Sequence, residues 1–269
     1  MPELPEVETT LRAIKKFQGH YLEKVIIHNR NLRWPVDKDL EEKSKNQKIA
    51  HLYRRAKYII FELENLCLFL HLGMSGSLRI SKNDDNYFIK HDHIEFVFHD
   101  EKIIFNDPRR FGSLHITNDI KNHKLISKLG PEPLSENFNG AYLFDLCKKS
   151  KKSIKTLIME QKNVVGIGNI YASEALFLSK INPLKSSNNL CLEECKKIVA
   201  SSKKILNAAI KVGGTTLKDF YSADGSPGYF KIKLNVYGRN GQKCKTCKQK
   251  IKKSIISQRA TFYCSNCQN

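Results

Sequence analysis

The sequence lacks a run of 18 apolar residues and a basic, apolar leader, and its first charged residues are acidic. Neither a membrane-spanning helix nor a secretory signal is therefore expected, and we predict a cytoplasmic protein with no membrane partner. Acidic residues are also scarce, since 27 aspartates and glutamates face 46 lysines and arginines, a formal net charge of +19. This excess favours a polyanionic partner, with a membrane surface as the alternative.

The eight cysteines are not arranged as a disulfide framework. Four of them form two Cys-x-x-Cys pairs separated by 16 residues, namely Cys244, Cys247, Cys264 and Cys267. In a reducing compartment this spacing is typical of a zinc site with four thiolate ligands. Because four thiolates leave no open coordination position, the sequence predicts one structural Zn²⁺ ion.

Residues 24 to about 117 consist of short apolar or alternating runs separated by turn-rich breaks. These runs are 25–27, 49–52, 58–63, 66–70, 94–98 and 103–105. They predict an antiparallel β-sandwich, flanked by an N-terminal helix with an apolar stripe at Val7, Leu11 and Ile14. In residues 129–134 two prolines flank one residue, which disfavours both helix and sheet and predicts a hinge.

From Phe138 to Val212 the apolar period becomes helical, and the longest amphipathic helix runs from Leu192 to Ala209. Gly213 and Gly214 are expected to end it. The fold class predicted is α+β and multidomain: an N-terminal β-sandwich, a helical domain and a β-hairpin zinc finger. The predicted boundaries are 1–130 for the sandwich, 131–137 for the hinge, 138–228 for the helical domain and 229–269 for the zinc finger.

The first residues have a chemistry of their own. If Met1 is removed, Pro2 offers a secondary amine, with the carboxylates of Glu3 and Glu6 close behind. A terminal amine has a pKa of about 7.7–8.0 against about 10.4 for lysine, so far more of it is neutral and nucleophilic near pH 7.5. Attack on a sugar C1′ would give a cationic iminium that acidifies the C2′ hydrogen, while Glu3 carries protons. The same residues also suit an ordinary helix start.

Three internal stretches, residues 72–76, 107–112 and 163–172, are suited to DNA binding. In residues 163–172 the glycines allow close approach to a phosphate, and a helix beginning near Asn169 directs free N–H groups at it, although an ordinary glycine-rich turn has the same pattern. Met74 and Phe111 lie among glycines, prolines and arginines, which favours exposed loops over core packing. Such apolar side chains could fill the gap left by an extruded nucleotide.

Together with the opening Pro2-Glu3-Leu4-Pro5-Glu6, these motifs resemble the bacterial formamidopyrimidine-DNA glycosylases. The resemblance runs from Pro2 to Cys267 without a large insertion. It implies a monomeric base-excision repair enzyme that acts on double-stranded DNA containing oxidised purines (8-oxoguanine or formamidopyrimidines) or abasic sites. It also implies a helix–two-turn–helix in 138–228, a lid over the flipped purine in 215–229, and a Pro2 Schiff base followed by β- and δ-elimination.

The resemblance also implies roles for single residues. Lys57 matches a lysine that contacts phosphate and donates a proton, and Arg259 matches an arginine that binds the phosphate beside the lesion and assists the second elimination. Arg109 matches the residue that reads the orphaned base. The other residues expected to bind DNA are His71, Met74, His91, Phe111, Lys155 and Asn169.

Two other functions would leave different features in the sequence. An endonuclease VIII-type glycosylase for oxidised pyrimidines would carry glycine in place of Leu4 and would lack the Arg-Arg-Phe motif at 109–111. A non-catalytic zinc-containing DNA-binding protein would need neither a free Pro2 nor Glu3.

Overall fold

The computed structural model describes residues 2–85, 88–213 and 234–269. These residues fold into two compact units, 2–127 and 128–212 with 234–269. Among the described residues, no helix is both long and apolar enough to cross a membrane. The lid expected over a flipped purine, in 215–229, lies outside the described residues.

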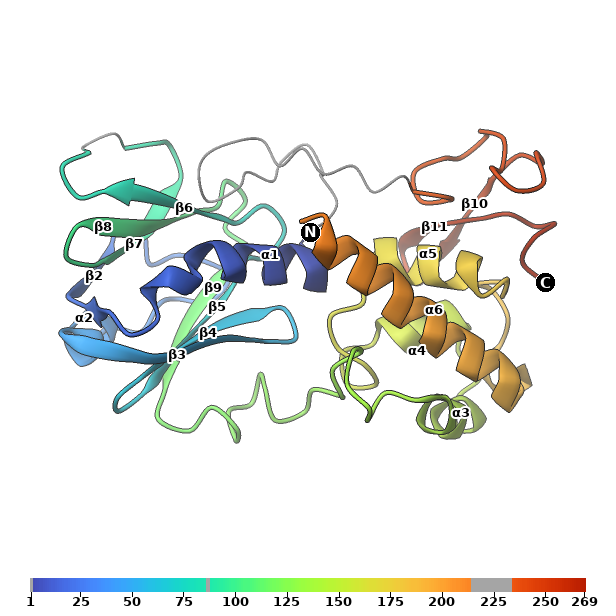
Figure 1. The fold of residues 1–269 in the computed structure, drawn as a ribbon, viewed down its shortest axis with the longest axis horizontal. Helices are drawn as coiled ribbons and strands as arrows, with labels where there is room; N and C mark the ends of the chain where they lie inside the picture. The colour runs from blue at the N-terminus through green and yellow to red at the C-terminus, as the bar shows by residue number, and fades with distance from the viewer. Residues whose placement is uncertain (1, 86–87, 214–233) are drawn as a thin grey trace. The chain divides into compact units, whose positions relative to one another are not determined.

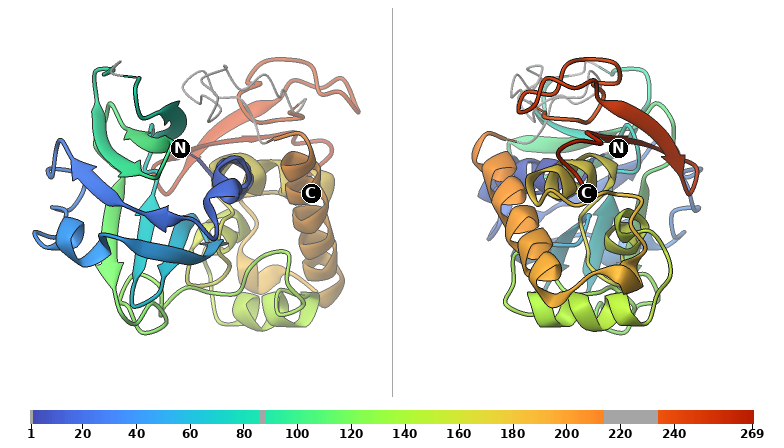
Figure 2. Two further views of the ribbon diagram at one scale, coloured as in Figure 1. Left: turned by 60° about the vertical axis from the view of Figure 1, so that its left-hand side comes forward. Right: turned by 90° about the vertical axis from the view of Figure 1, so that its right-hand side faces the viewer.

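The first unit is built from two antiparallel sheets and a flanking helix, α1 (Leu4–Ile14) (Figures 1 and 2). One sheet has the strand order β1 (Tyr21–Leu22), β3 (Gln47–Arg55), β4 (Tyr58–Leu63), β5 (Cys67–His71), β9 (Ser113–Thr117). The other has the order β2 (Lys24–Ile27), β7 (Asp92–Val97), β8 (Glu101–Asn106), β6 (Ser77–Lys82). The short helices η1 (Lys15–Phe17) and α2 (Leu40–Ser44) complete the unit.

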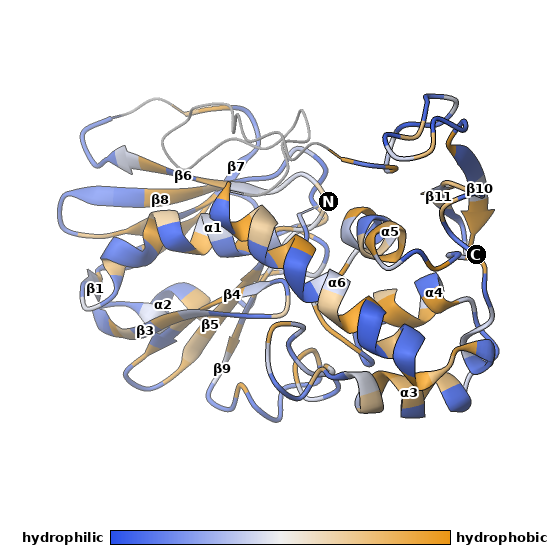
Figure 3. Ribbon diagram, turned by 45° about the vertical axis from the view of Figure 1, so that its right-hand side comes forward, coloured by the Kyte–Doolittle hydropathy of each residue, from blue (hydrophilic) through white to orange (hydrophobic). Residues whose placement is uncertain are grey.

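The core of this unit contains apolar side chains from both sheets and from α1. Phe61 of β4 stacks on Phe96 of β7 with ring centroids 5.1 Å apart, which joins the two sheets. The predicted stripe of Val7, Leu11 and Ile14 is buried, and Figure 3 shows apolar and polar residues alternating along α1. The expected sandwich with a flanking helix is confirmed.

Helix α1 begins where the sequence suggests. Pro5 occupies its first turn, where a missing N–H costs nothing, and the Glu6 carboxylate accepts a hydrogen bond of 2.9 Å from the Glu3 N–H. The Arg54 guanidinium pairs with the Glu8 carboxylate at 3.0 Å and so ties α1 to β3. The start of α1 is therefore rigidly attached to the hairpin of β3 and β4.

The second unit contains four α-helices, one short 3-10 helix and a two-stranded hairpin among its described residues. These are α3 (Gly140–Lys148), α4 (Ile154–Met159), α5 (Asn169–Leu178), α6 (Leu192–Lys211), the short η2 (Ser187–Asn189), and the strands β10 (Lys252–Ile256) and β11 (Arg259–Tyr263). The segment 129–134 contains no helix or strand, as its prolines predicted. Helix α6 buries the apolar face expected from its period and is followed by Gly213 at a φ of 82°. The helical domain and zinc hairpin expected after the sandwich are confirmed.

Candidate functional site

Pro2 and Glu3 lie immediately before α1, and both are buried. Helix α1 packs on β3 and β4, the strands that flank Lys57. The connection between these strands is the two-residue turn Ala56-Lys57, in which Ala56 has a φ of 54° and its carbonyl accepts a 2.9 Å hydrogen bond from Arg54 Nη1. The lysine is 6% exposed. Because Arg54 also pairs with Glu8, helix α1 is attached to the turn that carries Lys57.

His71 ends β5 and pairs with Tyr58 on β4, with ring centroids 4.9 Å apart. Burial first, and then the nearby charges of Lys57 and Arg33, lower the pKa of His71 to about 4. Its Nδ1 lies 3.0 Å from the Gly73 N–H and accepts from it, so the proton of the neutral ring is on Nε2. His71 is consequently a neutral hydrogen-bond donor, suited to a phosphate or sugar oxygen.

His91 has a φ of 75°, in the left-handed region that residues other than glycine rarely adopt. The neighbouring Asp92 fixes this bend, because its carboxylate pairs with the Arg79 guanidinium and accepts a 2.9 Å hydrogen bond from the Ile89 N–H. The Asn106 amide donates to Asp92 at 2.8 Å and to the Lys90 carbonyl at 3.0 Å. The backbone on both sides of His91 is therefore held in place.

Met74 and Phe111 are 39% and 42% exposed, so they are loop residues and not part of the core. Arg109 is also exposed, and its guanidinium lies 5.0 Å from the centroid of the Phe111 ring. Met74 and Phe111 are the residues expected to fill the gap and Arg109 the residue expected to read the orphaned base, and the structure places all three on two adjacent loops of one unit.

Asn169 is the first residue of α5, which begins where the glycine-rich motif predicted. Its side-chain oxygen accepts from Lys155 Nζ at 2.6 Å, and its amide donates to the Ala260 carbonyl at 3.0 Å. Lys155 is 1% exposed and also lies 2.7 Å from the Thr261 hydroxyl oxygen. The structure thus places Lys155 inside the second unit, where it connects α4, α5 and β11.

Arg259 is exposed and follows the turn of the β10–β11 hairpin. The apolar runs at 254–256 and 261–263 predict a hairpin turn at 258–260. The register instead pairs Ile256 with Arg259, so the turn residues are Ser257 and Gln258. Both have left-handed φ angles, 47° and 61°, as two-residue hairpin turns require. A cavity of about 200 Å³ is lined in part by Arg259 and Lys155.

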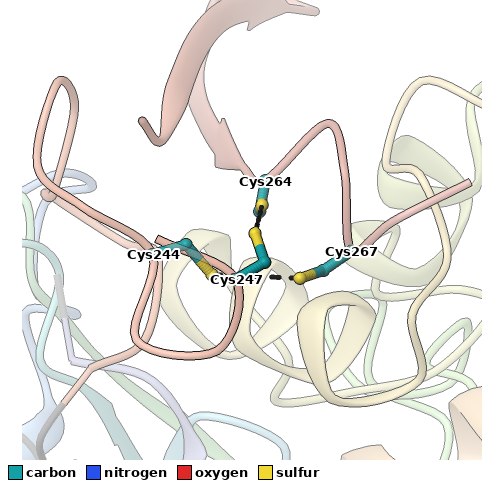
Figure 4. A group of neighbouring side chains, drawn as sticks. All are labelled: Cys244, Cys247, Cys264 and Cys267. Atoms are coloured by element: carbon teal, nitrogen blue, oxygen red, sulfur yellow. Dashed lines mark hydrogen bonds between the residues drawn. The ribbon is translucent and has the colours of Figure 1, made fainter. Parts of the chain in front are cut away.

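The four predicted metal ligands meet in one cluster (Figure 4). The sulfur atoms of Cys244, Cys247, Cys264 and Cys267 all lie within 4.8 Å of one another. A tetrahedral site with Zn–S bonds of about 2.3 Å separates its sulfurs by about 3.8 Å, so the residues fit a zinc ion. A structural zinc bound by four cysteines is therefore supported by the geometry.

The zinc-binding segment is anchored to α5 by a residue that sequence reasoning did not single out. The Glu174 carboxylate is fully buried and accepts hydrogen bonds of 2.9 Å from the backbone N–H groups of Asn235, Val236 and Tyr237. A second missed residue, Asp107, organises the loop of Arg109 and Phe111. Its position before Pro108 was a turn signal, whereas nothing local marks Glu174 as buried.

Three family models match the chain. The formamidopyrimidine-DNA glycosylase N-terminal domain matches residues 1–114, the formamidopyrimidine-DNA glycosylase H2TH domain matches 129–221, and a zinc finger found in FPG and IleRS matches 241–269.

Similar proteins extend over the whole chain. Proteins named formamidopyrimidine-DNA glycosylase from Saccharophagus degradans and Escherichia coli are 48% and 46% identical, with 100% of both chains covered in each case. The Lactococcus lactis Fpg bound to DNA with an abasic site has a TM-score of 0.91 at 35% identity, covering 99% of each chain. MutM (Fpg) from Thermus thermophilus has a TM-score of 0.88 at 33% identity, covering 99% of this chain and 98% of the other.

Proposed function

Because the chain belongs to the formamidopyrimidine-DNA glycosylase family, we propose that Pro2 is the nucleophile of its reaction and Glu3 the proton carrier. The protein is a DNA glycosylase for oxidised purines with abasic-site lyase activity, and it acts in base excision repair. The observation that carries the assignment is the burial of Pro2 and Glu3 at the start of a helix that packs on the Lys57 hairpin.

The proposed reaction begins once Met1 has been removed. The Pro2 nitrogen forms a bond to C1′ of the lesion nucleotide, and the bond between C1′ and the base breaks as the base leaves with a proton. The C1′–O4′ bond then breaks as O4′ takes a proton, which opens the sugar and leaves an iminium between C1′ and the Pro2 nitrogen. This iminium withdraws electrons, so the C2′ hydrogen is lost and the 3′ phosphate departs. A second elimination releases the 5′ phosphate. Glu3 supplies and removes protons on the sugar, and Lys57 donates one during the first elimination.

Phosphate binding is proposed for residues of both units. In the first unit, Lys57 supplies a charge and His71 a neutral Nε2 donor, while His91 is presented by its constrained loop. In the second, Asn169 lies at a helix start and Arg259 beside a tight turn. Helix N-termini and arginine guanidinium groups are both suited to phosphate oxygens. Lys155 is assigned to this set through its hydrogen bonds to Asn169 and the hairpin.

Extrusion of the lesion is proposed for the exposed loop residues. Met74 and Phe111 would occupy the gap in the base stack, and Arg109 would read the orphaned cytosine, whose Watson–Crick edge offers acceptors. The exposure of all three side chains supports this role. The zinc ion has a structural role, because its four thiolate ligands leave no position for a substrate.

The substrate preference and setting follow from the family. Solved relatives include a point mutant of the Lactococcus lactis Fpg in complex with Fapy-dG DNA, and we propose that this chain takes the same class of lesion together with 8-oxoguanine. Since its DNA substrate lies in the bacterial cytoplasm, we place the protein there; a monomeric state stays a prediction. The named relatives are purine-lesion enzymes, so neither the endonuclease VIII-type nor the non-catalytic alternative is favoured.

The decisive test is borohydride trapping on a duplex with 8-oxoguanine opposite cytosine, followed by mass spectrometry of the adduct. We expect a cross-link on a peptide that begins with Pro2, which would identify the nucleophile and Met1 removal together. The Pro2→Gly variant should trap weakly, and Glu3→Gln should excise slowly while binding the duplex. An adduct on another residue, or undiminished cleavage by Pro2→Gly, would overturn the assignment.

A further inference from the structure

Two loops of the first unit touch through their backbones. Residues 72–76 carry Met74, and residues 107–112 carry Arg109 and Phe111. A Cβ atom on Gly73 would lie 2.4 Å from both the Gly112 nitrogen and the Phe111 carbonyl carbon, so no side chain fits there. The Gly73 backbone, at a φ of 68°, is also in a conformation that favours glycine. The loops therefore form one contiguous surface.

A single carboxylate joins the two loops. Asp107 is fully buried, and its Oδ1 accepts a 2.6 Å hydrogen bond from the Ser75 hydroxyl of the other loop. Its Oδ2 accepts at 2.7 Å from the Gly112 N–H. The Arg109 N–H lies 3.2 Å from Ser75 Oγ and 3.3 Å from Asp107 Oδ1, so both side chains fix the backbone from which the Arg109 guanidinium projects.

The backbone of Asp107 extends this connection to the His91 loop. Its N–H donates to the His91 carbonyl at 3.1 Å. Its carbonyl oxygen, which can only accept, lies 2.8 Å from His93 Nε2 and 3.1 Å from the Arg110 N–H. Asp107 thus contacts each of the three loops that present Met74, His91, and Arg109 with Phe111.

We propose that Asp107 and Ser75 are positioning residues that hold Met74, Arg109 and Phe111 as one rigid wedge, so that lesion extrusion and reading of the opposite base occur together. The inference rests on the proposed function of these three side chains. A wedge already ordered before it meets DNA avoids the entropic cost of ordering two separate loops during insertion. Hydrogen bonds to a charged, buried carboxylate are strong enough to maintain that order.

The Ser75 bridge can be removed with little disturbance to the fold. Ser75→Ala deletes only the link between the loops, whereas Asp107 keeps its bonds to the backbone of its own loop. Ser75→Thr restores the hydroxyl. A matched control is Ser81→Ala, because Ser81 donates a 2.7 Å hydrogen bond to a carboxylate in the same way, to Asp85, but at the far end of β6.

The experiment compares single-turnover excision of 8-oxoguanine opposite cytosine and opposite adenine with trapping at a preformed abasic site. We expect Ser75→Ala to slow excision opposite cytosine by about tenfold and to narrow the preference for cytosine. Trapping at the abasic site should be unchanged, Ser75→Thr should recover most of the loss, and Ser81→Ala should match wild type. The proposal would be overturned if Ser75→Ala lowered both excision rates and abasic-site trapping by the same factor, or if it lowered none of the three.

Amide hydrogen exchange gives a readout that does not depend on activity. Removing the bridge should accelerate exchange at the Arg109 and Gly112 amides in Ser75→Ala but not in Ser81→Ala. Unchanged exchange at both amides would show that Ser75 does not hold the loops together. A wild-type protein that neither excises nor traps would contradict the proposed function, and hydrogen exchange would still decide whether the bridge holds the loops together.

Discussion

The Lys155 ammonium lies 2.6 Å from the side-chain oxygen of Asn169, although these residues belong to different helices. The lysine is 1% exposed and also reaches the Thr261 hydroxyl at 2.7 Å, two residues after Arg259. Lysine is almost never this buried unless it is paired. The contact holds two residues proposed to bind phosphate, Asn169 and Arg259, within one connected network.

Replacing Lys155 with methionine separates this bridging role from direct phosphate contact. Lys155→Met keeps most of the apolar stem but removes the donor to the Asn169 side-chain oxygen and the Thr261 hydroxyl. Because these contacts hold Asn169 and the hairpin of Arg259 in place, we expect weaker DNA binding. The slope of log affinity against log salt concentration should stay unchanged, because no counterion release is lost. Arg259→Ala, at an exposed residue proposed to bind phosphate, should lower that slope by about 0.9. A similar decrease for Lys155→Met would instead indicate that Lys155 contacts DNA.

Because His71 is neutral in the folded protein, its protonation should make the stability of the fold depend on pH. Its pKa falls to about 4 in the folded protein, from an ordinary value near 6.5, so between these values the unfolded chain binds more protons. This residue therefore lowers stability as the pH falls from 6.5 to 4 and has no such effect above pH 7. NMR titration of the histidine ring protons, assigned with His71→Asn, should give an apparent pKa near 4. A midpoint above 6 would contradict the neutral-donor role.

Loss of a zinc ligand should weaken DNA binding by way of Arg259, which the zinc-dependent hairpin carries. Cys264→Ser should release zinc, disorder the β10–β11 hairpin and weaken DNA binding, because such sites fold together with their metal. Zinc content by atomic absorption and affinity for an abasic-site duplex measure the two effects. Cys191→Ser is the matched control, since Cys191 is exposed and lies outside the four-cysteine cluster. Unchanged affinity in zinc-free Cys264→Ser would refute the link.

Arg109→Ala should reduce discrimination between cytosine and adenine opposite the lesion more than it reduces affinity for DNA. A bidentate arginine contact to a base contributes about 1–3 kcal/mol, so we expect the preference for cytosine over adenine to fall about tenfold. Affinity for an abasic site should fall less. The neighbouring Arg110→Ala, which keeps the backbone N–H bonded to Asp107, should leave the preference largely intact. Equal losses of discrimination and affinity for Arg109→Ala would argue against a reading role.

The sequence was most informative where local pattern decides structure. Strand β4 matches its predicted range of 58–63, and α6 buries the face that its 3.6-residue period defined. The zinc cluster follows from spacing, because each Cys-x-x-Cys pair places two sulfurs on one turn. The opening motif and the scattered glycine-rich and basic motifs also sufficed to indicate the family and the expected site residues.

Strands with weak local patterns were missed. β6 (Ser77–Lys82) and β9 (Ser113–Thr117) contain few apolar residues, and β1 has only Tyr21 and Leu22. They are strands because β8, β5 and β3 offer them backbone hydrogen bonds, with registers such as Leu78 opposite Phe105. Partners so far away in the chain leave no signal in the residues themselves.

The sequence by itself determined which residue types are present for the chemistry, and the tertiary structure decided the state of each. Burial beside Lys57 and Arg33 makes His71 a neutral donor, and three neighbours in other elements turn Lys155 inward. Ser75 meets Asp107 across 32 positions of sequence. Protonation, burial and hydrogen bonding depend on groups brought together by folding, and for that reason no local pattern could specify them.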